Sequence, residues 1–212
     1  MEHNPLTERV HVLGIGGSLR KNSYNRALLR AAQELAPDDM EIRIFDNETL
    51  SQIPPYNEDI RQHGDPETVE ILKDEIRNAD ALLFAIPEYN HSFTGVLKNA
   101  IDWASRPANA SPLNDKPIAI MGASIGMGGT VRAQMQFRQI CVFTNMHPLN
   151  KPEVLVGNAQ QKFDSDGGKL IDPDSREFLA QLLKALLDWT RRLSYGRVMV
   201  EIGEKNIPSR EK

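Results

Sequence analysis

The sequence predicts an α/β fold: an open, mostly parallel β-sheet with helices on both faces. Two observations support this prediction. Short apolar runs alternate with longer amphipathic stretches, and one run, residues 81–86, contains only apolar side chains. A strand that is buried on both faces reads as such a continuous apolar run. Because parallel strands need crossover connections, which are right-handed, the alternation of strand and helix favours a parallel sheet.

Five strands are predicted from short apolar or alternating runs. In chain order they cover residues 10–15, 40–45, 81–86, 117–121 and 152–156. Runs of about four to eight residues, bounded by turn-forming residues, are typical of strands. Pro87 ends the third run, because proline cannot donate a backbone hydrogen bond to a sheet.

Five helices are predicted between and after these strands. They cover residues 24–36, 65–79, 95–105, 130–143 and 174–192. Apolar residues recur every three or four positions along most of them, which is the spacing of one helical face. Asp65, Pro66 and Glu67 predict the second helix start, with a side-chain cap, a proline at the first position and an acid in the first turn. Residues 46–64 are predicted to be a long polar loop.

The length of 212 residues predicts one folded domain with a sizeable core. We place this domain at residues 1–192 and a C-terminal extension at residues 193–212. The extension has few apolar side chains and ends in charged residues, so we expect it to be loosely ordered.

Composition excludes several classes of partner. The 25 Lys and Arg against 29 Asp and Glu give a formal net charge of -4, so we expect neither nucleic acid nor a membrane as partner. The single cysteine, Cys141, excludes an internal disulfide and argues against a zinc site, and we expect no metal. The N-terminal residues do not resemble a secretory signal, and no apolar stretch reaches the roughly 20 residues of a membrane span. We therefore expect a cytoplasmic location.

The loop after the first strand, residues 16–25, is the first part of a predicted binding site. In open α/β sheets, ligands bind beyond the carboxyl ends of the strands. The start of a helix attracts anions, and four side chains here could bind a terminal phosphate. They are Ser18, Arg20, Ser23 and Asn25. The P-loop motif is absent, and Leu19 stands where the dinucleotide motif needs Gly or Ala. Alternatively, Ser23 or Asn22 only caps the helix.

The loop after the third strand covers residues 87–93 and contains the aromatic side chains Tyr89 and Phe93. Backbone groups and rings of this kind suit a flat heteroaromatic ligand. We expect neither Glu88 nor His91 to act in catalysis, because neither has a defined partner in the sequence. Alternatively, the segment is a turn that begins at proline and leads into the next helix.

The loop after the fourth strand, residues 122–130, contains four glycines and Ser124. This composition indicates close backbone approach, either to the polar edge of a ligand or to a neighbouring helix. The helix that follows, residues 130–143, should lie partly in the core and partly at an oligomer interface. Cys141 lies in its apolar part, and we expect an inert buried thiol.

Together these loops resemble the NADPH-dependent FMN reductase family, which includes bacterial quinone and chromate reductases. The strings that carry the resemblance are GSLRKNSYN at 17–25, PEYNHSFTGVLKNAIDW at 87–103 and Ser-x-Gly-x-Gly-Gly at 124–129. The resemblance extends from about residue 10 to residue 189. It implies a flavodoxin-like three-layer α/β/α fold with a five-stranded parallel sheet, bound FMN, and homodimers or homotetramers.

The resemblance also assigns residues by motif. It implies that Ser18, Arg20, Ser23 and Asn25 bind the FMN phosphate. It implies that Pro87, Glu88, Tyr89 and Asn90 flank the isoalloxazine, and that Ser124 and Gly126 complete the ring site. The implied reaction is hydride transfer from NADPH or NADH to FMN, then electron transfer to a quinone-like or other small acceptor, such as FMN, chromate or an azo compound. No catalytic side chain is expected. A flavodoxin-type electron carrier and a non-redox nucleotide-binding domain are the alternatives.

Overall fold

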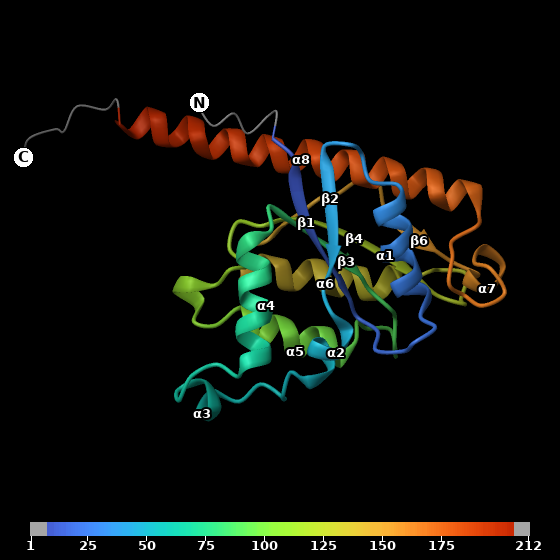
Figure 1. The fold of residues 1–212 in the computed structure, drawn as a ribbon, viewed down its shortest axis with the longest axis horizontal. Coiled ribbons are helices and arrows are strands. Elements are labelled where there is room, and N and C mark those ends of the chain that lie inside the picture. Colours follow the sequence, from blue (N-terminus) through green and yellow to red (C-terminus); the bar gives the residue numbers. More distant parts are fainter. Residues whose placement is uncertain (1–7, 206–212) are drawn as a thin grey trace, which may run out of the picture.

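The computed structural model describes residues 8–205 and consists of a parallel sheet between two layers of helices (Figure 1). The strand order is β2-β1-β3-β4, and β5 and β6 both pair with β4. The strands are β1 (Val10–Gly16), β2 (Met40–Ile44), β3 (Ala81–Ala85), β4 (Pro117–Ala123), β5 (His147–Pro148) and β6 (Val154–Val156). All strand pairs are parallel, so the predicted fold class is confirmed.

The helices divide between the two faces of the sheet. The longer ones are α1 (Tyr24–Glu34), α4 (Glu67–Asn78), α5 (Gly95–Ala104), α6 (Val131–Thr144) and α8 (Pro173–Lys205). The short ones are α2 (Asn47–Gln52), α3 (Glu58–Arg61), η1 (Ala108–Ala110) and α7 (Ala159–Lys162). Buried residues of α1 and α8 form one core cluster with the sheet, and those of α2, α4, α5 and α6 form the other. The central strand β3 is buried along its whole length, because both clusters cover it.

The fifth predicted strand, residues 152–156, corresponds to β6, and the structure adds a short strand, β5, that was not predicted. β5 pairs with Pro117 and Ile118 at the start of β4, whereas β6 pairs with residues 121–123 at its end. Pro148 and Pro152 lack the N–H groups that a continuous ladder would use, so the chain leaves the sheet between the two short strands. β6 nevertheless continues the pairing with β4 at the carboxyl end of that strand.

The predicted loop of residues 46–64 contains two short helices. Asp46 caps α2 by accepting a hydrogen bond from Thr49 N at 2.7 Å, and Leu50 and Ile53 are buried in the core. Asn57 caps α3 in the same way. The two helices were not predicted, because the prolines in this segment suggested irregular structure throughout.

The predicted cap at the start of α4 was wrong. Pro66 occupies the N-cap position and no side chain caps this helix end. Asp65 instead forms an ion pair with Lys73, whose side chain is only 3% exposed. A buried ammonium group needs a counter-charge, which outweighs the weaker benefit of a helix cap.

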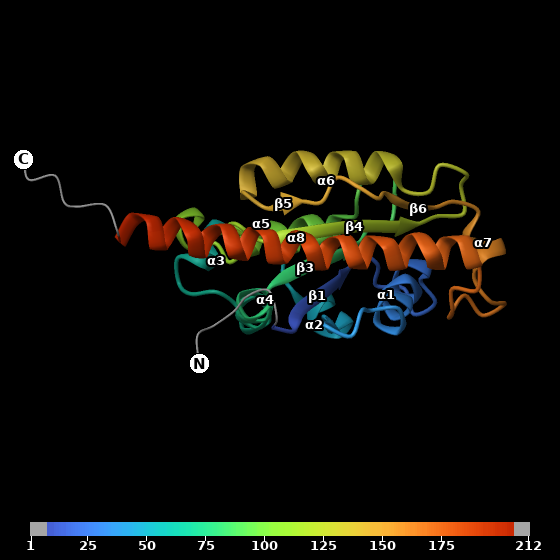
Figure 2. The ribbon, with the colours of Figure 1, turned by 90° about the horizontal axis from the view of Figure 1, so that it is seen from above.

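The last helix continues beyond its predicted end at Arg192. α8 runs without a break from Pro173 to Lys205, and its C-terminal part extends past the edge of the sheet (Figure 2). The apolar stripe that packs on the sheet ends near residue 190, so periodicity alone suggested an earlier stop. Residues 206–212 of the predicted extension lie outside the described residues. Within the described part of the chain, no helix combines the length and the hydropathy needed to cross a membrane.

Cys141 lies on the side of α6 that faces the core. Its thiol donates a hydrogen bond to Phe137 O at 3.2 Å, and the residue is 1% exposed. Burial raises the pKa of the Cys141 thiol to about 12. The expectation of a buried thiol is therefore confirmed, and it is protonated at neutral pH.

Candidate functional site

A pocket of about 470 Å³ lies at the carboxyl edge of the sheet, where β1, β3 and β4 end. It is lined by Ser18, Arg20, residues 22–25, residues 87–89, residues 123–125 and residues 165–167. The three loops selected from the sequence therefore meet at one place. Most of the predicted site residues line this pocket, whereas Asn90 and Gly126 do not.

The first loop presents hydroxyl groups and a guanidinium at the start of α1. Ser18 and Ser23 are both 3% exposed, and their Oγ atoms accept hydrogen bonds of 3.4 Å from Arg20 N and Arg26 N. Each hydroxyl can still donate its own proton to a ligand. The Arg20 guanidinium donates to Asn22 O at 3.0 Å, which holds the charge beside the helix start. This end of the pocket is therefore suited to an anion.

Asn25 lines the pocket and also has a structural role. Its side chain is 4% exposed and forms two hydrogen bonds of 2.9 Å with the backbone of Ala123, donating to O and accepting from N. These bonds connect the first turn of α1 to the last residue of β4. Asn25 thereby fixes the distance between the first and third loops.

The second loop is a tight hairpin. Tyr89 and Ser92 exchange backbone hydrogen bonds of 2.8 and 3.0 Å, and φ is positive at Asn90 and His91, at +53° and +62°. Two residues with positive φ between paired residues are typical of a type I′ turn. Gln136 on α6 fixes the hairpin by donating to His91 O at 3.0 Å and accepting from Ser92 Oγ at 2.6 Å. The turn carries Asn90 out of the pocket, so that Tyr89 is the residue of this turn that lines it.

Glu88 lines the pocket, but its carboxylate is directed to α6. The Oε2 atom accepts hydrogen bonds from Arg132 N at 3.0 Å and Ala133 N at 3.2 Å. The guanidinium of Arg132 lies 3.6 Å from Oε1. Glu88 therefore caps α6 from a distant loop, since Thr130 at the N-cap position makes no side-chain cap.

The third loop packs closely on its own neighbours. A Cβ atom on Gly122 would overlap Thr130 Oγ1 and lie 2.5 Å from Ile86 O, so no side chain fits there. Ser124 Oγ accepts a hydrogen bond from Gly126 N at 3.0 Å, and this turn keeps Gly126 away from the pocket. Close backbone packing, the alternative considered from the sequence, thus accounts for much of the glycine content.

Phe93, expected beside a ligand ring, lies instead against the core. Its ring is 5.5 Å from that of Phe137 on α6, in an edge-to-face arrangement.

Sequence reasoning missed a fourth loop, residues 163–170. Its ends, Phe163 and Leu170, form an antiparallel bridge, and its tip at residues 165–167 lines the pocket. Turn-forming residues between two apolar ones, Phe-Asp-Ser-Asp-Gly-Gly-Lys-Leu, are a recognisable hairpin signal. The signal was available, although nothing in it indicated a position beside the other three loops.

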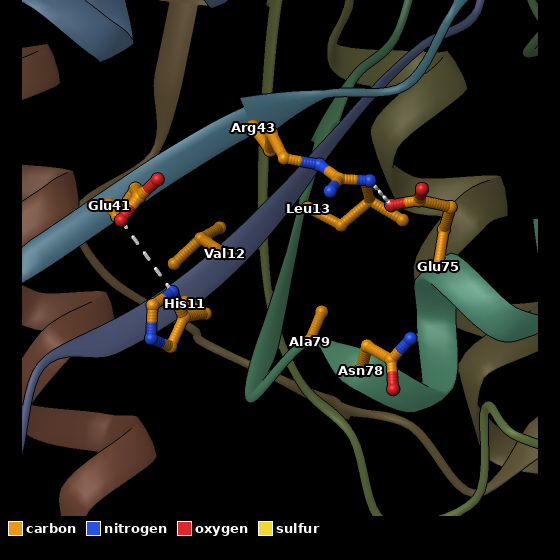
Figure 3. A pocket seen from close by; sticks show the side chains of 8 residues that line it. All are labelled: His11, Val12, Leu13, Glu41, Arg43, Glu75, Asn78 and Ala79. Atoms are coloured by element: carbon orange, nitrogen blue, oxygen red, sulfur yellow. Dashed lines mark ion pairs between the residues drawn. The ribbon is translucent and has the colours of Figure 1, made fainter.

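A smaller hollow of about 140 Å³ lies elsewhere, where β1, β2 and the end of α4 meet. Figure 3 shows that its charged side chains face one another: His11 lies 3.8 Å from Glu41, and Arg43 pairs with Glu75. Among the residues that the structure describes, no group of three potential metal ligands gathers here or elsewhere. Its charges are already paired, so we do not consider it the functional site.

Comparison with known proteins identifies the family. Residues 10–161 match the family described as NADPH-dependent FMN reductase, and this range contains three of the four pocket loops. The chain belongs to this family. It is an NAD(P)H-dependent oxidoreductase that uses FMN, with a flavodoxin-like fold, as the resemblance implied.

Relatives of this FMN reductase family cover nearly the whole domain. The NAD(P)H-dependent FMN reductase of Pseudomonas aeruginosa is 53% identical over 188 residues, which cover 89% of this chain and 99% of that protein. The quinone reductase of Escherichia coli is 39% identical over 189 residues, with the same coverage of 89% and 99%. A solved flavoenzyme, the NAD(P)H:(acceptor) oxidoreductase of Paracoccus denitrificans, has a TM-score of 0.78 at 33% identity and covers 86% of this chain and 98% of that one.

The residues of the pocket fit the cofactor of the family. Two buried hydroxyls, one guanidinium and a helix start suit a phosphate, and the first turn of α1 contains no acidic residue that would oppose it. The backbone of residues 87–89 and the Tyr89 ring suit an aromatic ring system. The volume lies within the range of roughly 300–1,000 Å³ that is usual for ligand pockets.

Proposed function

We propose that this oxidoreductase holds FMN in the four-loop pocket and passes electrons from NAD(P)H to a quinone-like acceptor that enters the same pocket. One observation carries the proposal: a single pocket joins an anion site at the start of α1 to Tyr89 and the backbone at the end of β3. That arrangement matches a ligand with a phosphate at one end and a flat ring at the other.

The side chains of the first loop have separate tasks in this proposal. The hydroxyls of Ser18 and Ser23 donate to phosphate oxygens, and Arg20 supplies a charge-assisted contact. Asn25 holds α1 against β4 through Ala123, so that these donors face the ring end at a fixed distance. A rigid frame of this kind reduces the ordering that binding would otherwise require.

The cofactor supplies the hydride and electron chemistry when it is bound. The chain contributes position: the Tyr89–Ser92 hairpin, fixed by Gln136, keeps the Tyr89 ring at the pocket wall. Glu88 is occupied as the cap of α6, so we do not expect its carboxylate to act as a general acid or base here.

The test measures flavin retention in the Arg20→Ala/Ser23→Ala double variant. Loss of a charge-assisted contact and a hydroxyl donor should weaken FMN binding by on the order of 10- to 100-fold. Lys21→Ala is the matched control, because Lys21 is an exposed neighbour that does not line the pocket. Unchanged flavin content in the purified double variant would contradict the proposal. NADPH oxidation with a quinone and no added reductase then separates an enzyme from an electron carrier.

We further propose that the chain forms homo-oligomers through the outer face of α6. Val131, Met135 and Val142 are spaced by four and seven positions, and Met135 and Val142 are 60% and 83% exposed. Phe143 is 74% exposed beside them. An exposed apolar face of this kind is typical of an interaction surface. The Met135→Glu/Val142→Glu double variant should run as a monomer in size-exclusion chromatography with light scattering, whereas the control Gln181→Glu, an exposed change on α8, should not.

We also propose a cytoplasmic location. The support is the chain's one unpaired, buried thiol and its need for NAD(P)H. Cell fractionation with an antibody against the chain would test this.

A further inference from the structure

The fourth loop, residues 163–170, is organised by its own carboxylate. Asp164 Oδ1 accepts hydrogen bonds from Gly168 N at 2.7 Å and Lys169 N at 3.2 Å, and Asp164 O accepts one from Gly167 N at 2.8 Å. Gly167 has φ of +66°, which a glycine adopts without strain. The tip of the loop is therefore a defined turn.

This turn is attached to the first turn of α1. The rings of Tyr24 and Phe163 lie 4.9 Å apart, and a Cβ atom on Gly167 would lie 3.1 Å from the Tyr24 ring. Farther along α1, Arg30 donates to Gly168 O at 2.9 Å. The fourth loop is thus fixed to the helix that carries Ser23 near its start, and its tip lines the pocket.

The tip carries one carboxylate, that of Asp166. Two carboxylates line the pocket, and Glu88 is already occupied by α6. Within residues 8–205, by contrast, Asp166 has no hydrogen bond or ion pair, and it is exposed. An ionised carboxylate only accepts hydrogen bonds, so it suits a ligand part that carries several hydroxyl donors and disfavours a phosphate. FMN has such a part between its ring and its phosphate.

We propose that the tip of the fourth loop is a further binding element, which recognises the polyhydroxyl chain of the bound flavin. In this proposal Asp166 accepts hydrogen bonds from the hydroxyls, and Tyr24 is a positioning residue that holds the loop in place. The inference rests on the proposed function. It concerns a segment that lies beyond residues 10–161, the range that matches the family.

The test compares three flavins with apoprotein by quenching of flavin fluorescence. FMN has the polyhydroxyl chain and the phosphate, riboflavin lacks the phosphate, and lumiflavin lacks both. Asp166→Ala should lower the affinity for FMN and for riboflavin by on the order of tenfold. The affinity for lumiflavin should stay within about twofold of the wild-type value. Asp166→Asn, which keeps one acceptor oxygen, should recover part of the loss. Lys169→Ala, an exposed change outside the pocket lining, should bind all three as the wild type does.

The role of Tyr24 is tested in the same way. Tyr24→Ala removes the ring that packs on Phe163 and Gly167. It should lower the affinity for FMN and riboflavin but not the affinity for lumiflavin. Tyr24→Phe keeps that ring and should restore binding. The variant that combines Tyr24→Ala with Asp166→Ala should lose little more FMN affinity than either single variant, because both changes act through the fourth loop. A general loss of structure would instead lower the affinity for all three flavins.

Some outcomes overturn the inference alone. They are unchanged binding of FMN and riboflavin by Asp166→Ala, an equal loss for all three flavins, and tighter binding of FMN, which would place the carboxylate beside the phosphate. Wild-type protein that binds none of the flavins would overturn the proposed function, and this inference with it.

Discussion

Replacing Asn25 by alanine separates a structural role from a role in binding phosphate. The change removes both hydrogen bonds to Ala123, each of 2.9 Å and both buried. Each bond contributes about 1 kcal/mol net, and a buried N–H or C=O that loses its partner costs about 1–3 kcal/mol. The apoprotein should therefore lose roughly 2–5 kcal/mol of its free energy of unfolding, a large share of the usual 5–15 kcal/mol.

Urea unfolding of the apoprotein measures this loss directly. With an m value of about 1–3 kcal/mol/M, a loss of about 3 kcal/mol lowers the midpoint by roughly 1–3 M. Ser23→Ala is the comparison, because Ser23 only caps α1 through a long bond of 3.4 Å. Its expected cost is about 0.5–2 kcal/mol.

The opposite pattern would refute this reasoning. If Asn25→Ala unfolded within about 0.5 kcal/mol of the wild type while FMN affinity fell, Asn25 would act mainly on the phosphate. Its bonds to Ala123 would then contribute little. Such a result would return Asn25 to the role that the family motif implied.

Three further predictions concern other buried positions. Gly122→Ala should destabilise the fold by about 1–3 kcal/mol or more through overpacking, whereas Gly95→Ala, with no atom within 4 Å of its Cβ, should shift the melting temperature little. Asp65→Ala should cost about 3–5 kcal/mol in thermal unfolding because it leaves Lys73 buried without its partner, and adding Lys73→Met should recover much of that loss. Since burial raises the pKa of Cys141 from 9.0 to about 12, the unfolded chain loses this proton first as pH rises. The free energy of unfolding of the wild type should therefore fall between about pH 9 and 12 relative to that of Cys141→Ala. If urea titrations gave the same pH dependence for both proteins, the buried thiol would be contradicted.

The sequence predicted the elements whose signal is local. The apolar run at residues 81–86 became β3, and the periodic stretch at residues 24–36 became α1, with ends that differ by one or two residues. The three glycine-containing or proline-initiated loops met at one pocket, because the carboxyl ends of parallel strands share one edge. Family resemblance was needed to connect that pocket with a flavin.

The features that escaped prediction depend on contacts between distant residues. Asn25 and Ala123 are 98 positions apart, and Glu88 reaches the start of α6 across 44 positions. No periodicity reveals such bonds, so these backbone contacts were not predicted from the sequence. The fourth loop had a local hairpin signal, but its place beside Tyr24 depends on how α1 and α8 pack together.

The course of α8 has a practical consequence for attaching the protein to a surface. The helix begins near α7 at the pocket edge and its other end lies past the opposite side of the sheet (Figure 1). At 1.5 Å per residue, its 33 residues span about 50 Å. A linker joined near the end of this helix would tether the molecule to an electrode or bead with the pocket facing the bulk solution. Immobilised protein of this design would keep the pocket open to diffusing reactants.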